Sequence, residues 1–113
     1  EKFEWDDLVS NTKYTNGYTQ ESATVYYFWD IFFNVFSQNE RKKLLFFITG
    51  LRSSPIGGLK TIHLKIERSE NVNFLPTSHT CIMSLVLPDY RDRTTLENSL
   101  RVCLRNCEGF GLV

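Results

Sequence analysis

Apolar residues recur at spacings of three and four along three stretches of the chain, a period that predicts helices with one buried face. The predicted helices cover residues 19–36 or 22–36, residues 38–49, and a last stretch from about residue 93 to before residue 109. A short helix is also predicted over residues 3–9, with Trp5 and Leu8 on one face. Ser37 and Glu40 have the spacing of a capping box, and Gly50 is placed to end the second helix in a left-handed conformation. Arg41, Lys42 and Lys43 of this helix are assigned to a solvated face.

Two shorter stretches have the pattern of strands. Residues 60–68 alternate between apolar and polar side chains, which predicts a half-exposed strand with His63 on its polar side. Residues 82–87 are apolar on both faces, which predicts a central strand that Pro88 ends. Loops or turns are expected at residues 10–17, 53–58 and 69–73.

This order of elements predicts an α+β fold in which helices are followed by a small β-sheet and a C-terminal helix. The 113 residues fit one domain, and at this length roughly two-thirds of the unfolded chain's surface can be buried. Nine Phe, five Tyr and two Trp supply enough large side chains for a hydrophobic core. We therefore expect residues 1–113 to form a single domain, and the sequence contains no internal repeat.

Charge and composition argue against several classes of function. Lys plus Arg and Asp plus Glu number 13 each, so no basic excess points to nucleic acid or to an anionic membrane surface. The most apolar stretch, residues 25–36, contains Asp30 and Asn34 and is too short to span a membrane. There is no signal peptide pattern, and three cysteines exclude a complete disulfide framework. These features predict a reducing compartment, the cytoplasm and/or the nucleus, with no nucleic-acid or membrane partner.

No metal site and no cofactor are expected from the cysteines or the glycines. Cys103 and Cys107 share a helix face, but zinc would require two further ligands, and no second Cys/His pair has suitable spacing. Both cysteines are therefore predicted to be core residues. The pair Gly57 and Gly58 lacks the Lys-Ser/Thr of a phosphate-binding loop and is assigned to a turn.

Cys81 is the candidate nucleophile. It follows the stretch Leu-Pro-Thr-Ser-His-Thr at residues 75–80, which predicts a loop, and it precedes the apolar strand. A thiol at this junction can be reached while the strand fixes its position, and His79 could stabilise a thiolate. A buried structural cysteine is the alternative. A hydrolase triad would need a group that orients a catalytic histidine, and none is evident in the sequence. Acyl transfer between thiols requires little general-acid help and therefore suits a single cysteine better.

The chain resembles the C-terminal lobe of HECT-type ubiquitin-protein ligases over nearly its whole length. The resemblance is carried by the Leu-Pro-Thr-Ser-His-Thr-Cys stretch and by shorter matches at residues 11–18, 28–29, 47–50, 55–59, 87–90 and 109–111. It implies that Cys81 accepts ubiquitin as a thioester, with His79 and Thr80 in supporting roles. It also implies that Phe110 is needed for transfer onto the substrate.

Two positions depart from the family pattern. Ile82 stands where many members have Phe, and Val113 replaces the terminal acidic residue of one subfamily, which puts that subfamily's lysine-linkage preference in doubt. The resemblance implies three partners: ubiquitin, a protein substrate, and a ubiquitin-conjugating enzyme that would bind a larger N-terminal lobe. The chain, which does not begin with Met, would then be a fragment of a longer ligase. A non-catalytic module that binds ubiquitin or another protein is the alternative function.

Overall fold

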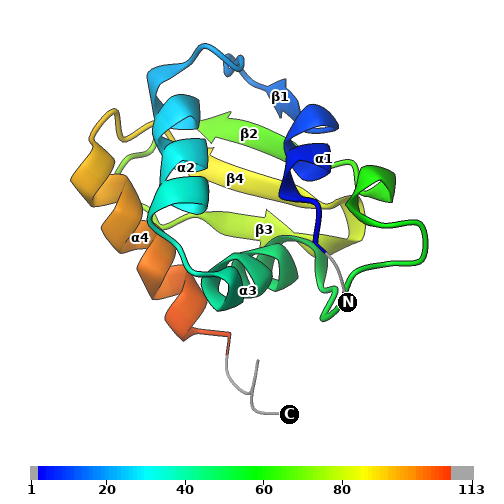
Figure 1. The fold of residues 1–113 in the computed structure, drawn as a ribbon. Coiled ribbons are helices and arrows are strands. Elements are labelled where there is room, and N and C mark those ends of the chain that lie inside the picture. The colour runs from blue at the N-terminus through cyan, green and yellow to red at the C-terminus, as the bar shows by residue number, and fades with distance from the viewer. Residues whose placement is uncertain (1–2, 108–113) are drawn as a thin grey trace.

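The computed structural model describes residues 3–107, which form helices packed on one face of a four-stranded sheet (Figure 1). The α+β class predicted from the sequence is confirmed. In chain order the elements are α1 (Trp5–Ser10), β1 (Lys13–Thr15), α2 (Ala23–Asn34), α3 (Gln38–Thr49), the 3-10 turn η1 (Leu59–Thr61), β2 (Lys65–Ser69), β3 (Thr77–His79), the 3-10 turn η2 (Thr80–Ile82), β4 (Ser84–Pro88) and α4 (Arg93–Arg105).

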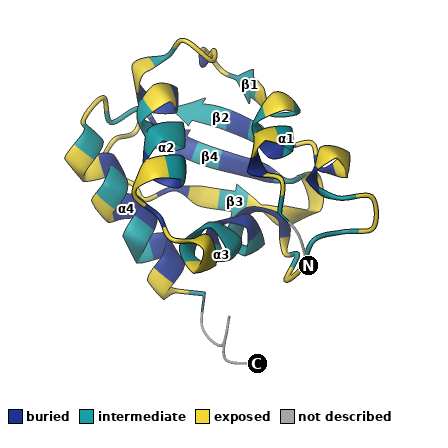
Figure 2. Ribbon diagram, viewed as in Figure 1, coloured by how far each residue is buried: buried dark blue, intermediate teal, exposed yellow. Residues whose placement is uncertain are grey.

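The sheet has the strand order β1-β2-β4-β3, so β2 and β4 are central and β1 and β3 are edges. β1 pairs with β2 and β2 with β4 in parallel, whereas β3 pairs antiparallel with β4. Ile66, Leu85 and Leu87 are fully buried under the helices, and Figure 2 shows the buried positions on both central strands. No helix of the described part of the chain covers the opposite face of the sheet (Figure 1).

α3 begins and ends where the sequence predicts. The Ser37 hydroxyl accepts a hydrogen bond from the backbone N–H of Glu40, and the Glu40 carboxylate accepts one from the N–H of Ser37, which completes the capping box. Gly50 ends the helix with φ of 78°, the left-handed conformation expected of it. Of the two starts predicted for α2, the structure agrees with the one at Ser22, which is the N-cap residue, and the helix ends at Asn34, two residues earlier than predicted; it buries Val25, Phe28 and Phe32 among other residues.

Two short strands were not predicted. Residues 13–15 and 77–79, which the sequence assigns to loops, pair as the two edge strands of the sheet. Their partners lie far away in the sequence or across a turn, so local propensity carries little information about them. Pro76 directly precedes β3, a position that an edge strand tolerates.

The two predicted strands are shorter than their sequence patterns. β2 begins only at Lys65, so residues 60–64 of the alternating stretch lie outside the strand. Ile62 and Leu64 are nevertheless buried as the alternation predicts, and His63 is exposed. In the second stretch, Ile82 is 56% exposed and Val86 is half-buried on the uncovered face. The apolar run is therefore not fully buried on both faces, and Ile82 lies in η2 rather than in β4. β4 is nevertheless central, because it is hydrogen-bonded on both edges.

Arg41, which the sequence assigns to a solvated helix face, connects two helices instead. Its guanidinium donates hydrogen bonds to the backbone carbonyls of Phe32 and Phe33 at 2.7 and 2.8 Å. Those carbonyls belong to the last turn of α2, where a helix lacks internal partners for its C=O groups. A cation at this end also interacts favourably with the helix dipole.

Among residues 3–107, no helix is long and apolar enough to cross a membrane.

Asp89 ties the end of β4 to β2 and α2. Its carboxylate accepts hydrogen bonds from the Thr24 hydroxyl and from the guanidinium groups of Arg68 at 2.9 Å and Arg91 at 3.2 Å. Burial raises the pKa of Asp89, but the hydrogen bonds from Thr24, Arg68 and Arg91 outweigh it and leave the pKa below its ordinary value. Nearby, the Tyr18 hydroxyl donates to the carbonyl of Leu87 at 2.8 Å.

We predict that Asp89→Asn lowers the free energy of unfolding by about 1–3 kcal/mol at neutral pH, the usual range for hydrogen bonds to a charged group. Because the folded-state pKa is depressed, the stabilisation is present above the unfolded-chain pKa of about 4 and is lost as the pH falls through the folded value. Denaturant titrations of both proteins between pH 7 and pH 3 should show the difference shrinking with acid. A difference independent of pH would contradict the assigned role of the carboxylate.

Candidate functional site

Cys81 lies in the tight connection between the antiparallel strands β3 and β4. His79 and Ser84 are the last paired residues of this hairpin, and residues 80–83 form the turn between them. Within the turn, the Met83 N–H donates to the carbonyl of Thr80 at 3.1 Å, and Met83 adopts a left-handed conformation with φ of 51°. The Met83 carbonyl in turn accepts from the N–H of Lys65 at 3.0 Å. Both ends of the turn are thus hydrogen-bonded into the sheet.

The end of α3 supports this turn. A Cβ built on Gly50 would lie 3.8 Å from the Cβ of Thr80, ordinary van der Waals distance, so the helix terminus and the turn are adjacent. α3 also packs against β3 and β4. The left-handed Gly50, which ends the helix, therefore also shapes the surface on which Thr80 rests.

The predicted site residues that the structure describes are together and accessible. Cys81 is a free, exposed cysteine, and His79 and Thr80 beside it are exposed as well. The neighbouring Ile82 is more than half exposed as well. Phe110, the fourth predicted site residue, lies outside the described residues. An exposed thiol at the end of a hairpin that is fixed in the sheet is accessible to an electrophile.

The other two cysteines are less suited to nucleophilic chemistry. Cys103 is buried, and its thiol donates to the carbonyl of Pro76 at 3.6 Å. Burial raises the pKa of Cys103 to about 11, and burial also raises the pKa of the half-buried Cys107. The core role predicted for Cys103 is confirmed. The contact with Pro76, which sequence reasoning missed, holds the start of β3 against α4.

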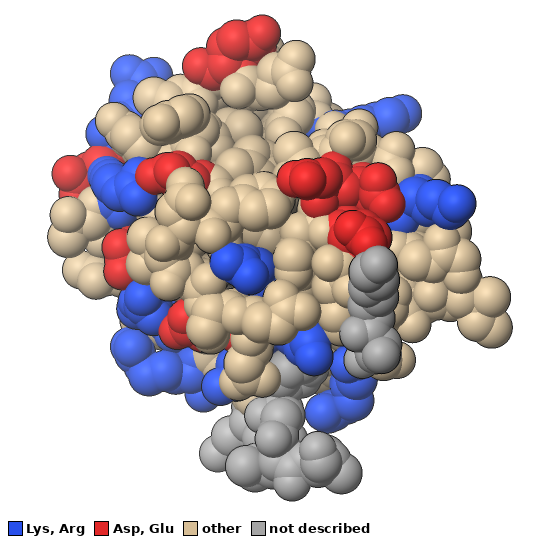
Figure 3. Space-filling view, viewed as in Figure 1, with Lys and Arg blue, Asp and Glu red and all other residues tan. Residues whose placement is uncertain are grey.

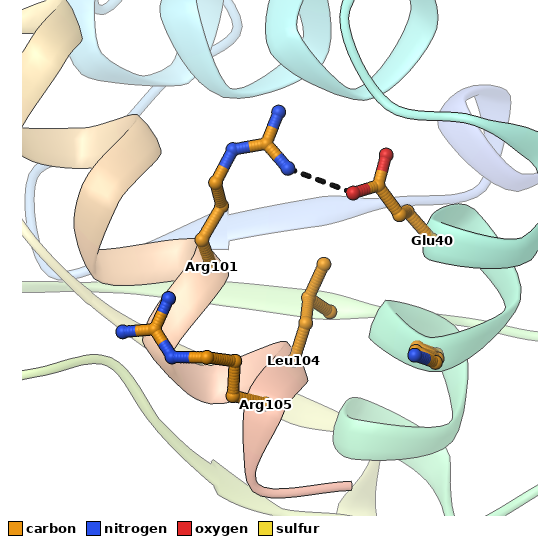
Figure 4. A pocket seen from close by; sticks show the side chains of 5 residues that line it. Glu40, Arg101, Leu104 and Arg105 are labelled. Carbon is orange, nitrogen blue, oxygen red and sulfur yellow. Dashed lines mark hydrogen bonds and ion pairs between the residues drawn. The ribbon is translucent and has the colours of Figure 1, made fainter.

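A hollow between α3 and α4 is a second candidate site, but two of its charged groups, Glu40 and Arg101, are paired with each other (Figure 4). Arg101 pairs with Glu40 at 2.7 Å and with Glu97 at 3.2 Å, which joins the two helices. Glu40 is about 15 Å along α3 from Gly50, since each helical residue rises about 1.5 Å. The hollow is therefore remote from the Cys81 turn. Figure 3 shows basic and acidic side chains mixed over this side of the molecule.

The part of the chain that the structure describes offers no set of metal ligands. Residues 3–107 contain no group of three or more His, Cys, Asp or Glu side chains placed to hold an ion. The chemistry available at the site is that of an exposed thiol with an imidazole and hydroxyls close by in the chain.

These features define an α+β lobe that presents one exposed thiol on the turn of an edge hairpin. A model of the HECT-domain (ubiquitin-transferase) family matches residues 1–113, and the chain belongs to this family. It is 40% identical over 106 residues to mouse probable E3 ubiquitin-protein ligase HECTD2, covering 93% of this chain and 13% of that protein. It is 35% identical over 112 residues to human probable E3 ubiquitin-protein ligase HERC4, covering 98% of this chain and 10% of the relative.

A yeast relative extends this pattern. The chain is 36% identical over 110 residues to E3 ubiquitin-protein ligase HUL5 of Saccharomyces cerevisiae, covering 95% of this chain and 12% of HUL5. The chain thus spans only 10% to 13% of the length of these relatives. The family is shown by the match, and the family resemblance inferred from the sequence is confirmed.

We predict that a thiol reagent labels Cys81 first in the folded protein. Cys81 is exposed, whereas Cys103 and Cys107 are shielded and have raised thiol pKa values, so their reactive thiolates are scarcer. Timed alkylation at pH 7.5, followed by peptide mass spectrometry, should show near-complete labelling of Cys81 before either helix cysteine reacts. In denaturant the three rates should converge. Labelling of Cys103 or Cys107 ahead of Cys81 in the folded state would remove the basis for the site assignment.

Proposed function

We propose that the chain is the thioester-bearing lobe of a ubiquitin-protein ligase, with Cys81 as the residue that receives ubiquitin. The observation that carries the proposal is the exposure of Cys81 on a turn whose two ends are fixed in the sheet. Membership of the HECT-domain family supports it, as do relatives whose names describe E3 ubiquitin-protein ligases. Exposure makes the sulfur available to a protein-sized donor, and the fixed hairpin holds it in one place.

The proposed reaction has two acyl transfers. In the first, the Cys81 thiolate attacks the thioester carbonyl of ubiquitin on the conjugating enzyme; a new C–S bond forms and the enzyme's cysteine leaves as a thiolate. In the second, a neutral substrate lysine amine attacks the Cys81 thioester; a C–N bond forms, the C–S bond breaks, and the amine proton passes to solvent or to a nearby base. The thiolate of Cys81 is regenerated.

The groups around Cys81 suit this chemistry better than they suit hydrolysis. Exchange between two thiols of similar basicity requires no oriented triad, and an exposed thiol that is ionised a few per cent of the time is already a nucleophile. We assign His79 an auxiliary role, as a base within two residues of the sulfur. We assign Thr80 a positioning role, because it rests against the end of α3.

The proposed partners follow from the two transfers. Ubiquitin and a substrate protein would meet at Cys81, while the ubiquitin-conjugating enzyme would bind another part of the ligase, since this chain spans about an eighth of its relatives. We propose the cytoplasm and/or the nucleus as the compartment, where thiols stay reduced.

A non-catalytic binding module is the second candidate, and one observation favours it. Phe74 and Leu75 are 64% and 46% exposed, and together with Val86 and Pro88 they line an open groove on the uncovered side of the sheet. Exposed apolar side chains grouped in this way are typical of interaction surfaces. Such a module would bind a partner without forming a covalent adduct, so the test of Cys81 also separates the two functions.

We predict that Cys81→Ser in the complete ligase abolishes the reductant-sensitive ubiquitin adduct while leaving the fold intact. Serine can instead retain ubiquitin as an oxyester, because an alkoxide is a poorer leaving group than a thiolate. Gel analysis with and without dithiothreitol, after incubation with charged conjugating enzyme, distinguishes the two adducts. Cys107→Ser serves as the matched control and should behave like the wild type. Undiminished substrate ubiquitination by Cys81→Ser would refute the covalent mechanism.

The family resemblance assigns Phe110 to the second transfer. We predict that Phe110→Ala leaves thioester formation at Cys81 unchanged but slows substrate ubiquitination about tenfold or more, the size expected if one buried Phe contact is lost. Single-turnover rates for the two steps, measured separately, provide the test, with Leu112→Ala as a control in the same tail. A clear fall in melting temperature, or failure at the thioester step, would assign Phe110 a structural role instead.

A further inference from the structure

Four residues form a cross-strand row on the uncovered face of the sheet. The register places Lys13 opposite Lys65, Lys65 opposite Ser84, and Ser84 opposite His79, so the row contains one residue from each strand. Directly opposed residues point to the same side of a sheet. The residues that follow in β2 and β4, Ile66 and Leu85, are fully buried beneath the helices, so the row faces the opposite way.

The row contains an unfavourable pair of like charges. Lys13 and Lys65 are direct neighbours across β1 and β2, and like charges in that arrangement repel. None of the ion pairs among residues 3–107 includes either lysine. Glu67 lies on the same face two residues further along β2, but it is opposite Thr15 in the next row and makes no ion pair with Lys65. Neither ammonium group is therefore paired with a carboxylate of the described residues.

Ser84 is the second unsatisfied group of the row. It is 0% exposed, and its hydroxyl has no hydrogen-bond partner among residues 3–107. The register places this short side chain between two longer ones, Lys65 of β2 and His79 of β3. Buried hydroxyls usually have a partner, so an orphan at this position is an independent indication that a polar group belongs here.

The row ends at Cys81. His79 and Ser84 are the two residues that the Cys81 turn connects. Neighbouring strands are about 4.8 Å apart and a lysine side chain extends about 6 Å, so the Lys65 ammonium can come within about 10 Å of the turn. That distance is close to the range of electrostatic interactions at physiological ionic strength.

We propose that this row binds an acidic side chain of the protein whose lysine receives ubiquitin. The inference rests on the proposed function of Cys81. Ubiquitin is held by its covalent bond once the thioester has formed, whereas the acceptor has no such bond and must be placed within about 3 Å of the carbonyl by contacts alone. A row beside Cys81 that binds an anion can supply such contacts to the acceptor protein. The preferred substrate class is therefore a lysine with Asp or Glu nearby in the folded or extended segment that carries it.

The direct test is peptide binding to the 113-residue chain. An NMR titration with a peptide whose central Lys is flanked by Asp should shift the amide signals of Lys65, Ser84 and His79. A matched peptide with Ser in place of Asp should bind about threefold to tenfold more weakly, the factor expected for one or two exposed ion pairs. Raising the salt concentration to about 1 M should remove the difference, because the screening length falls to about 3 Å.

Charge variants show whether the row causes the preference for the Asp peptide. The double variant Lys13→Gln/Lys65→Gln should lose the preference for the Asp peptide while keeping the circular dichroism spectrum and melting temperature of the wild type. The control Lys43→Gln/Arg105→Gln removes the same charge from the hollow on the helix side and should keep the preference. An equal affinity for both peptides, no binding at all, or an unchanged preference in the row variant would overturn the inference.

The complete ligase separates this inference from the proposed function. The row variant should form the Cys81 thioester at the wild-type rate and show a reduced preference, by about threefold to tenfold, for ubiquitinating the Asp peptide over the Ser peptide. If the row variant formed the Cys81 thioester more slowly than the wild type, Lys13 and Lys65 would act in the first acyl transfer. That result would contradict the inference. A wild-type ligase that forms no thioester would refute the function of Cys81, while the binding measurement would still decide whether the row recognises acidic peptides.

Discussion

The pairing of β4 between β2 and β3 is the constraint on which the rest of the structure depends. β4 is hydrogen-bonded along both edges, and its alternate residues Leu85 and Leu87 are fully buried under the helices. A shift of one residue would turn both leucines out of the core and bring Ser84 and Val86 in. The strand therefore has one register, and the turn that holds Cys81 has one position relative to the core.

The helices are joined to one another and to the sheet through a cluster of aromatic side chains. On α2, Phe32 contacts the ring of Trp5 from α1 at 5.3 Å, and the Trp5 indole donates a hydrogen bond to Gln38 of α3 at 2.8 Å. Trp29 of α2 donates to the hydroxyl of Tyr14 in β1 at 2.9 Å. Three helices and an edge strand are thus connected around one aromatic cluster. The exposed chemistry on the hairpin depends on a core that is distant from it in sequence.

Features that a few consecutive residues determine could be predicted from the sequence. Features that depend on contacts between residues far apart in the chain could not. α3 was predicted with its bounds because Ser37, Glu40 and Gly50 specify both its ends locally. Cys81 could be singled out because its flanking motif is local as well, and the structure shows that it is exposed. β1 and β3 were missed because an edge strand of three residues is stabilised by its neighbour rather than by its own composition.

Arg41 was assigned to solvent because its partners, the carbonyls at the end of α2, carry no side-chain pattern. The cross-strand row needs the register of four strands, which no single stretch contains.

The most direct test of this account is to locate ubiquitin on the ligase during a single turnover. Wild-type enzyme should be mixed with charged ubiquitin-conjugating enzyme without substrate, quenched in acid, digested and analysed by tandem mass spectrometry. The account predicts a ubiquitin-derived adduct on the peptide that contains Cys81, removed by dithiothreitol. An adduct on the peptide that contains Cys103 or Cys107, or one on lysine alone that resists dithiothreitol at every time point, would contradict it.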